Sequence, residues 1–369
     1  MENIENQFAN IKVVGVGGAG CNAVARMQAE GIEGVDLIVA NTDLQILANS
    51  IVKNKIELGV SLTKGLGAGA DPEVGEKAAL ESEEQIKEAL RGADMVFVTC
   101  GMGGGTGTGA APVIARIARE LGALTVGVVS RPFTFEGKAR TARSIVGLQK
   151  LKDNVDSLII ISNDKLLEFV GQIPVSEAFN EADKILIQGV QTITDLIAVP
   201  AHINLDLNDV KAVMQDKGSA LIGIGIGSGE NKAEVAAKQA IASPLLEASI
   251  RGASHAIINV TGGASVTLQD AEDAVRVIEE YAGNDEIEVI FGIAVNEALN
   301  DEIVVTVIAT GFELPELEVT APINTTENTI TDIKDAADVS TADVESNDDV
   351  VTVKTPSDEL EVPAFLRNR

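Results

Sequence analysis

The sequence predicts an α/β protein in which a parallel sheet, covered by helices on both faces, is joined by a long central helix to a smaller α/β domain. Three observations predict this arrangement. Short apolar segments alternate with helical patterns from residue 11 to about residue 170, one amphipathic pattern covers residues 174–199, and further alternating segments follow up to Gly311. Strands that alternate with helices form parallel sheets, which bind ligands at the carboxyl ends of their strands.

The first part of the chain contains the strands of the larger sheet. These strand-like segments are short and apolar, and they cover residues 11–17, 35–43, 93–100, 123–130 and 157–164. Between them, apolar side chains recur at helical spacing. The spacing predicts helices over 22–31 and 110–122 and one long helix over 72–92.

Residues 174–199 predict a single helix of more than twenty residues. Its apolar side chains share one face and are Ala178, Ala182, Ile185, Leu186, Val190, Ile193 and Ile197. A helix of about 24 residues is ~36 Å long, which is enough to cross a domain. The smaller domain then has strand-like segments at 220–229, 253–262, 286–295 and 301–311, with helices near 230–249 and 268–282.

The composition predicts a globular protein with aliphatic cores. Of 369 residues, 45% are hydrophobic, but only 3% are aromatic and none is Trp. No run of about 18 apolar residues occurs and the N-terminus lacks the regions of a signal peptide, so we expect a cytoplasmic protein without membrane insertion. Cys21 and Cys100 have no metal-ligand spacing, so we expect small buried hydrophobes and no metal site made of protein side chains.

The negative charge is concentrated near the C-terminus. The chain carries a net charge of −28, and residues 313–361 contain 14 Asp or Glu and 2 Lys. This segment has no Phe, Tyr or Gly and no sustained apolar period, so it cannot bury enough surface to offset its ordering entropy. We expect a disordered acidic linker, and the acidity of the whole chain argues against binding to nucleic acid or to an anionic membrane.

A glycine-rich segment, CGMGGGTGTGAAPVIARIA (residues 100–118), connects a predicted strand to a predicted helix. Its bare backbone would aim N–H groups and the positive end of a helix dipole at an anion, and Thr106 and Thr108 add hydroxyl donors. No lysine occurs between Lys87 and Lys138, so the segment is not a Walker phosphate loop. The alternative is a flexible glycine linker.

Two more glycine-rich segments precede predicted helices. GVGGAGCNAV (15–24) satisfies G-x-G-x-x-G, and GLGAGADP lies at 65–72. Alone, the first favours a dinucleotide on a Rossmann-like sheet, with Asp43 near the spacing that holds a ribose in nicotinamide-dependent oxidoreductases. Several glycine loops at successive strand ends are better suited to a mononucleotide with three phosphates. A nucleotide-binding structural protein without turnover is a further alternative.

These motifs carry a resemblance to a known family. GVGGAGCNAV, ANTD, GAGADPEVG, GMGGGTGTGAAP, RPFTFEG, ISND, NLDLNDV and IATGF resemble the FtsZ family of bacterial tubulin-like GTPases of cell division, in order and throughout residues 11–312. The terminal EVPAFLRNR is similar to the peptide with which that family recruits membrane adaptors. The resemblance implies a tubulin-like fold, GTP as substrate and GDP as product, Mg²⁺ with the nucleotide, and head-to-tail filaments in a ring at midcell beneath the membrane. Leu207 and Asn208 depart from the family pattern, which raises a question about interface packing.

The resemblance also implies the residues of the GTP site. They lie at the predicted strand ends and at the start of the long helix, and are Gly17, Gly18, Ala19, Gly20, Cys21, Asn22, Asn41, Ala68, Gly69, Ala70, Asp71, Gly101, Gly103, Gly104, Gly105, Thr106, Gly107, Thr108, Gly109, Glu136, Arg140, Asn163, Phe179 and Asp183. Residues 68–71 would close over the γ-phosphate. Glu136 and Arg140 are four residues apart and could reach the ribose and phosphates together, although they could equally form a surface ion pair.

Phe179 and Asp183 are also four residues apart, near the start of the long helix. This pair suits guanine, because one carboxylate can accept hydrogen bonds from both N1–H and N2–H, whereas adenine opposes it with a ring acceptor. Asn163, at a neighbouring strand end, could complete the base pocket. The alternative is a core Phe beside a solvated Asp.

No residue in this set could position an attacking water. Asp206 and Asp209 remain as candidates, but they follow the end of the long helix, whereas Phe179 lies near its start. They would therefore be far from the nucleotide of their own subunit. They could act on the nucleotide of a neighbouring subunit if subunits stack head to tail, a heterologous contact that propagates into a filament. The resemblance implies the same mechanism, with hydrolysis only in the polymer.

We therefore expect six segments along the chain. They are a flexible N-terminus (1–10), a nucleotide-binding domain (11–175), the central helix (176–199), an activation loop with a C-terminal α/β domain (200–312), the acidic linker (313–360) and a partner-binding peptide (361–369). Within the peptide, the residues expected to contact membrane-tethering adaptors are Pro363, Ala364, Phe365, Leu366 and Arg367.

Overall fold

The computed structural model describes residues 9–32, 34–170, 174–198, 203, 205–243, 249–284 and 286–312. All of them belong to one compact unit, Met1–Thr320. The predicted acidic linker and partner-binding peptide lie outside the described residues, as do residues 1–8. Within the described part of the chain, no helix is both long and apolar enough to cross a membrane.

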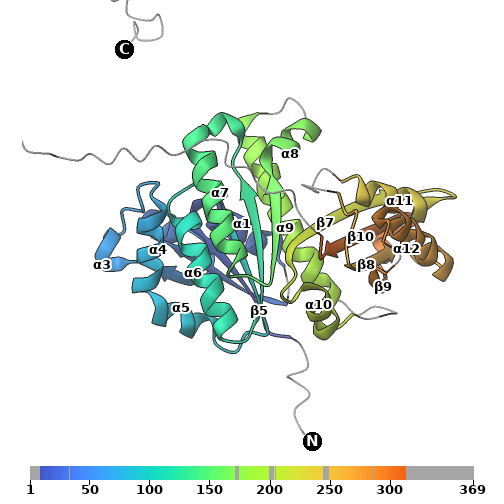
Figure 1. Cartoon of the computed structure of the whole chain (residues 1–369), viewed down its shortest axis with the longest axis horizontal. Helices are drawn as coiled ribbons and strands as arrows, with labels where there is room; N and C mark the ends of the chain where they lie inside the picture. The colour runs from blue at the N-terminus through green and yellow to red at the C-terminus, as the bar shows by residue number, and fades with distance from the viewer. Residues whose placement is uncertain are drawn as a thin grey trace, which may run out of the picture. The chain divides into compact units, whose positions relative to one another are not determined.

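Six parallel strands form the larger part of the sheet (Figure 1). They are β1 (Ile11–Val16), β2 (Val35–Asn41), β3 (Asn54–Glu57), β4 (Met95–Gly101), β5 (Leu124–Arg131) and β6 (Ser157–Ser162), arranged in the order β3-β2-β1-β4-β5-β6. Because the chain moves outward in opposite directions from β1 and from β4, a topological switch point lies between these two strands. In such sheets, ligands bind at the carboxyl ends of the strands beside the switch point.

Helices cover both faces of these strands. On one face lie α1 (Gly17–Glu30) and α9 (Val175–Ala198), and on the other lie α4 (Pro72–Glu81), α5 (Glu83–Leu90), α6 (Thr106–Glu120) and α7 (Lys138–Lys152). Successive strand residues alternate between the two cores, so that Val13 packs with the first set and Val14 with the second. Burial on both faces explains the nearly continuous apolar character of each strand. Short helices α2 (Leu44–Asn49), α3 (Val60–Thr63), α8 (Asn163–Val170) and η2 (Thr134–Glu136) follow strands or loops.

The C-terminal strands extend the same sheet. They are β7 (Gly218–Gly227), β8 (His255–Gly262), β9 (Glu288–Val295) and β10 (Ile303–Thr310), in the order β7-β10-β8-β9. β7 pairs in parallel with β6 from Ser157↔Gly218 to Ile159↔Ala220, and β10 is antiparallel to both of its neighbours. Helices α11 (Lys232–Ile241) and α12 (Leu268–Ala282) pack on these strands around a third core, α10 (Leu207–Met214) precedes β7, and η3 (Glu297–Leu299) follows β9.

The helix predicted over 72–92 is wrong in one respect, because it is two helices. α4 ends at Glu81 and α5 begins at Glu83, with Ser82 between them at φ −98° and ψ 16°. The Ser82 hydroxyl accepts a hydrogen bond from the Gly59 amide at 3.0 Å and donates one to the Glu57 carbonyl at 3.2 Å. This break ties the helices to the end of β3. The prediction of one long helix over 174–199 is confirmed by α9.

Candidate functional site

The three glycine loops gather at the carboxyl edge of β1 and β4. A Cβ atom placed on Gly17 would lie 2.7 Å from the Gly107 nitrogen, and one on Gly101 would lie 2.8 Å from the Ala19 Cβ. A Cβ on Gly105 would lie 2.9 Å from the Ala68 Cβ and from the Asp71 nitrogen. Loops that are far apart in the sequence therefore contact one another, and they form one side of the predicted GTP site.

Two helices begin in these loops without a side-chain cap. α1 starts after Val16 and α6 starts after Gly105, and neither has an acidic residue in its first turn. The first N–H groups of a helix have no intrahelical acceptor, and the helix dipole adds a partial positive charge there. Because α1 and α6 begin beside each other, this edge of the sheet is suited to a polyanion such as a triphosphate.

The predicted glycines fall into two groups. A side chain at Gly20, Gly107 or Gly109 would collide with or press on a backbone oxygen of Thr99, Gly101 or Pro72, respectively, so these glycines allow helices to pack closely. A Cβ atom added to Gly69 or Gly104 would have no other atom within 4 Å, and one added to Gly18 would have its nearest neighbour at 3.8 Å. At the second group, a side chain would point into open space rather than against backbone.

The two threonines of the α6 loop have different surroundings. The Thr106 hydroxyl lies 2.7 Å from the Thr42 hydroxyl, and Thr106 is partly exposed. Thr108 is buried, and its hydroxyl accepts a hydrogen bond from the Gly103 amide at 2.8 Å. Thr108 and the Gly103 amide thus shape the loop, in which Gly103 has a φ of 93° that favours glycine. Thr42 was missed as a site residue, although it lies within the ANTD motif.

Residues 21, 22 and 41 are at the side of the α1 loop. Cys21 is buried, as predicted, and burial raises the pKa of its thiol to about 12. The Asn41 amide lies 3.8 Å from the Cys21 sulfur and its oxygen accepts a hydrogen bond from the Asp43 amide at 3.2 Å. Asn22 is exposed. The Asp43 carboxylate, which could have held a cofactor ribose, caps α2 by accepting a hydrogen bond from Gln45 at 2.8 Å.

Residues 68–71 lie against the α6 loop. Ala68 is buried, and its carbonyl accepts a hydrogen bond from the Asp71 amide at 3.0 Å. Ala70 has a φ of 61°, which is uncommon for a residue with a side chain. The Asp71 carboxylate caps α4 through the Glu73 amide at 2.9 Å. The loop is thus held in a tight turn beside the open face of Gly69.

Glu136 and Arg140 form an ion pair at 2.9 Å, and Glu136 also accepts a hydrogen bond from the Phe133 amide at 2.9 Å. Arg140 lies over the α6 loop, because a Cβ on Gly103 would be 2.6 Å from the Arg140 carbonyl oxygen. Arg143, one turn further along α7, donates a hydrogen bond to the Gly103 carbonyl at 3.0 Å. Arg143 was not predicted from the sequence, where its only local signal is its spacing of three from Arg140.

Aromatic rings connect Phe179, in the predicted guanine pocket, to the turn that contains Phe133 and Phe135. Phe179 is 42% exposed, and its ring meets the buried Phe133 ring edge-on with centroids 5.3 Å apart. Phe133 also stacks on Phe135 at 4.9 Å. Asp164, next to Asn163, accepts hydrogen bonds from both the amide and the hydroxyl of Thr134. The start of α9, the end of β6 and the η2 turn are therefore brought together.

Two polar groups near the predicted base pocket, one largely buried and one fully buried, lack close partners among the described residues. The Asp183 side chain is 15% exposed, with the Arg26 guanidinium 3.5 Å away. Burial outweighs that attraction and raises the pKa of the Asp183 carboxyl to about 6. Asn163 is 5% exposed, and its side-chain oxygen has no hydrogen-bond partner in the described part of the chain. Because buried polar atoms are nearly always paired, the Asn163 oxygen is suited to a ligand that donates hydrogen bonds, and the Asp183 carboxylate, whose ion pair is long, can accept such bonds as well.

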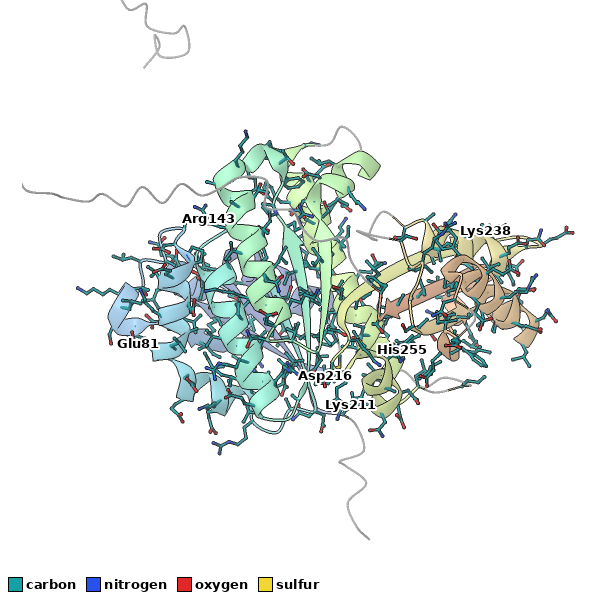
Figure 2. All side chains as sticks on the ribbon, in the orientation of Figure 1. Glu81, Arg143, Lys211, Asp216, Lys238 and His255 are labelled. Atoms are coloured by element: carbon teal, nitrogen blue, oxygen red, sulfur yellow. The ribbon has the colours of Figure 1, made fainter. Side chains whose placement is uncertain are left out.

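Asp206 and Asp209 are not part of this cluster. They form a capping box on α10: Asp206 accepts hydrogen bonds from the amides of Asn208 at 2.7 Å and Asp209 at 3.0 Å, and the Asp206 amide donates to Asp209 at 2.8 Å. α10 ends beside the first residues of β6, because the Ser157 hydroxyl donates a hydrogen bond to the Met214 carbonyl at 2.6 Å. These residues lie at the edge of the sheet opposite the glycine loops. In Figure 2, Asp216 and Lys211 are accordingly far from Arg143.

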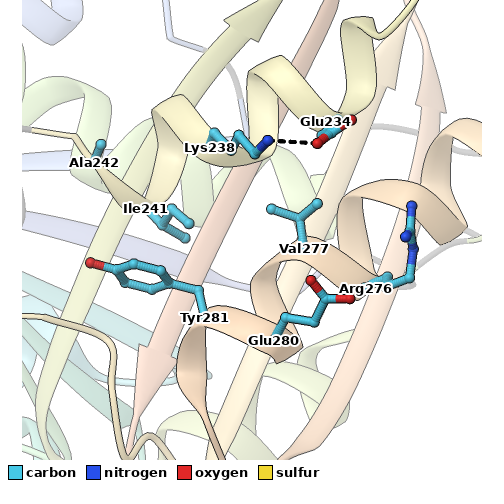
Figure 3. A pocket seen from close by; sticks show the side chains of 8 residues that line it. All are labelled: Glu234, Lys238, Ile241, Ala242, Arg276, Val277, Glu280 and Tyr281. Atoms are coloured by element: carbon cyan, nitrogen blue, oxygen red, sulfur yellow. Dashed lines mark hydrogen bonds and ion pairs between the residues drawn. The ribbon is translucent and has the colours of Figure 1, made fainter.

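A groove of about 500 Å³ lies between α11 and α12, away from the glycine loops (Figure 3). Its polar lining residues are Glu234, Lys238, Arg276, Glu280 and Tyr281, and aliphatic residues complete it. Glu234 and Lys238 neutralise each other in an ion pair. None of the predicted site residues lines this groove. Among the described residues, no cluster of three or more His, Cys, Asp or Glu side chains could hold a metal ion.

Comparison with known proteins places this geometry in a family. The GTPase domain of the Tubulin/FtsZ family matches residues 10–171, and the C-terminal domain of the FtsZ family matches residues 218–313. FtsZ of M. jannaschii, in an empty dimer, is 44% identical with a TM-score of 0.78, over 84% of this chain and 90% of that one. CetZ1 and CetZ2 from Haloferax volcanii, a GDP-bound monomer and a GTPγS-bound protofilament, are 21% identical with TM-scores of 0.73 and 0.70 and share the fold. They cover 82% of this chain, and the matches span 94% and 93% of their own chains. With both domains matched and a 44% identical relative aligned over most of its length, the chain belongs to the FtsZ family of tubulin-like GTPases.

Proposed function

We propose that this chain binds GTP at the carboxyl edge of β1 and β4 and hydrolyses it in head-to-tail filaments that form a cytokinetic ring. The observation that carries the proposal is the meeting of two uncapped helix N-termini, α1 and α6, at this edge, and the largely desolvated Asp183 carboxylate, which faces Arg26 of α1, adds support. The helix ends suit the phosphates, and the carboxylate suits the N1–H and N2–H donors of guanine. Membership of a GTPase family does not favour the nicotinamide-dependent oxidoreductase.

The residues present fit Mg²⁺ only together with a nucleotide. Among the neutral groups of the glycine loops, the Thr106 hydroxyl is partly exposed, and Arg140 and Arg143 are cations that contact the α6 loop. Mg²⁺ prefers oxygen ligands and usually takes several from phosphates and water. When bound with GTP, it would neutralise phosphate charge that this basic pair leaves uncompensated.

The acids of α10 complete the site of an adjacent subunit in this proposal. Their capping box holds both carboxylates in fixed directions, and among the described residues one oxygen of each carboxylate accepts no hydrogen bond. A contact that joins the acid end of one subunit to the glycine edge of the next repeats without closing, and so makes a filament. Self-association occurs among similar proteins, since the CetZ2 structure is a protofilament and the M. jannaschii FtsZ structure a dimer.

Mixing two inactive variants tests this split site. Asp209→Ala leaves the glycine edge intact, so we expect normal GTP binding by the monomer but slow phosphate release. Gly105→Ser places atoms against Ala68 and Asp71 and should disable the glycine edge while sparing α10. If both variants co-assemble, some interfaces join an intact pocket to intact acids, and phosphate release should partly return. Co-assembly without any return of activity would place the acids and glycines in a single intramolecular site and refute the proposal.

A matched control separates catalysis from helix capping. Asp270 occupies the same capping-box position in α12, where it accepts hydrogen bonds from both the amide and the hydroxyl of Thr267. Asp270→Ala should cost a similar ~1 kcal/mol of stability without lowering phosphate release.

Phosphate release should also begin above a threshold protein concentration. Assembly with no phosphate release at all would instead support a nucleotide-binding structural protein.

We further propose that residues 361–369 tether the filament to membrane adaptors, with the acidic linker supplying reach. The support is the sequence EVPAFLRNR, whose Pro363, Phe365 and Leu366 are the compact apolar cluster of the acidic tail. This proposal places the protein in the cytoplasm at the division site. It concerns residues outside the described part of the chain and is tested by the truncation given below.

A further inference from the structure

Helix α6 connects the two ends of the proposed site within one subunit. It begins at Thr106 in the glycine edge and ends at Glu120, about 22 Å further on. Near this far end, the Arg119 side chain leaves α6 and contacts two acids from other elements. The Arg119 Nη2 atom lies 2.5 Å from Asp216, and its Nε atom lies 3.4 Å from Asp156.

The Asp156 end of this contact is immobilised by the sheet. Its side chain is 6% exposed and accepts a hydrogen bond from the Thr125 amide at 2.8 Å. Its backbone carbonyl accepts hydrogen bonds from the amides of Lys217 at 3.0 Å and Gly218 at 2.9 Å. Arg119 is thus anchored where β5, β6 and β7 begin, and its Nη2 donor is directed to Asp216.

Asp216 belongs to the turn that follows α10. It has a φ of 55°, and the turn ends at Gly218 with a φ of 73°. The last carbonyls of α10 are also held, because Val213 accepts a hydrogen bond from Thr310 and Met214 accepts one from Ser157, both at 2.6 Å. The C-terminal end of α10 is therefore attached to β10, to β6 and, through Asp216, to α6.

The direction of α10 determines where its first residues lie. α10 has eight residues, so its capping box is about 12 Å from the held end. A tilt of about 10° at that end would move Asp206 and Asp209 by about 2 Å, and displacements of this size slow reactions strongly. The Arg119–Asp216 pair opposes such a tilt from the side of α6, whereas the hydroxyls that hold the α10 carbonyls belong to β6 and β10.

We propose that Arg119 is a positioning residue that, by holding Asp216, sets the place at which Asp206 and Asp209 meet the nucleotide of the adjacent subunit. The inference rests on the proposed function. It gives α6 two roles at its two ends: its first turn faces the subunit's own nucleotide, and its last turn holds the helix that serves the neighbour's nucleotide. The competing explanation is an ordinary surface ion pair, which contributes to stability alone.

Two substitutions test the pair from its two sides. Asp216→Asn removes the charge and suits the left-handed backbone, since Asn adopts it readily. Arg119→Ala removes the other partner. We expect each to leave GTP affinity and the threshold for assembly unchanged and to slow phosphate release per assembled subunit by about fivefold, the rate change equivalent to ~1 kcal/mol. The double variant should be no slower than the slower single variant, because both remove the same contact.

Arg116→Ala is the matched control. Arg116 lies one turn earlier on α6 and pairs with Glu120 and Glu83, without reaching α10. It should slow phosphate release less than Asp216→Asn does. Equal losses for the two variants, or additive losses in the double variant, would overturn the positioning role. Asp216→Asn keeps the experiment informative if Arg119→Ala fails to fold, since it leaves the buried Asp156 paired with Arg119.

The direction of the effect is measured in mixed filaments. Asp209→Ala subunits supply pockets, and Gly105→Ser subunits supply acids. Adding Asp216→Asn to the acid-supplying subunit should lower the restored activity about fivefold, whereas adding it to the pocket-supplying subunit should not lower it. Equal effects in both subunits, or none, overturn the positioning role while the proposed function stands. If the parent mixture restores no activity, the proposed function itself fails, and the positioning role fails with it.

Discussion

Replacing Asp183 by Asn should have opposite effects on the stability of the nucleotide-free protein and on GTP binding. Burial raises the pKa of the Asp183 carboxyl to about 6, whereas the ordinary value is 3.8. Between about pH 4 and 6, the folded state therefore binds more protons than the unfolded state. Stability falls as the pH rises through this window, by up to ~3 kcal/mol for a pKa difference of about 2.

The nucleotide-free Asp183→Asn protein should consequently be more stable than the wild type at pH 7.5, since it has no charge to desolvate. GTP should bind it more weakly, because the carboxamide cannot accept hydrogen bonds from N1–H and N2–H together. Mismatched buried polar groups cost ~1–3 kcal/mol, or about 5- to 150-fold in affinity. Wild-type affinity should also decrease as the pH falls below about 6, where Asp183 gains a proton, and this pH dependence should disappear in the variant.

Titration of the monomer with GTP by calorimetry between pH 5.5 and 8, together with thermal unfolding without nucleotide, measures both effects. Asp195→Asn is the matched control: burial raises the pKa of this α9 carboxyl too, but it lies three turns further along the helix. Asp195→Asn should leave GTP affinity unchanged at every pH. Unchanged GTP affinity in Asp183→Asn at pH 7.5 would remove Asp183 from the base pocket.

Three further predictions concern the loops and the tail. Gly109→Ala drives a methyl group into the Pro72 carbonyl and should destabilise the fold by ~2–3 kcal/mol in urea unfolding, whereas Gly104→Ala, with open space around it, should leave stability nearly unchanged and weaken GTP binding. Equal losses of stability in the two would contradict the separation of packing glycines from open ones. Thr108→Val removes the acceptor of the Gly103 amide, so it should cost ~1–3 kcal/mol and weaken GTP binding indirectly; an unchanged melting temperature would argue against this role. Deleting residues 360–369 should leave phosphate release intact and abolish binding to adaptor-coated vesicles, and normal vesicle binding by the truncated protein would disprove the peptide's role.

The strands and the loops at their ends could be predicted from the sequence because their signals are local. A buried parallel strand is apolar throughout, and a glycine run between a strand and a helix is visible without knowledge of its neighbours. The order of these units also places their loops at one edge of a sheet. The helical pattern was similarly sufficient to place Phe179 and Asp183 in the first half of one long helix, as in α9.

Other features depend on which segments meet in space, and the tertiary structure alone decided them. Ser82 breaks a helical pattern because Gly59 and Glu57 lie beside it, and β7 joins the larger sheet through β6, although 55 residues separate Ser162 from Gly218. Identical glycines have different roles because Pro72 faces Gly109, whereas a Cβ on Gly104 would meet open space. The sequence determines residue types and their local periodicity. The burial of Asp183 and the contact of Arg119 with Asp216 arise from packing between segments that are far apart in the sequence, so no local pattern encodes them. In the proposed function, the first affects the charge of the Asp183 carboxyl and the second the direction of α10.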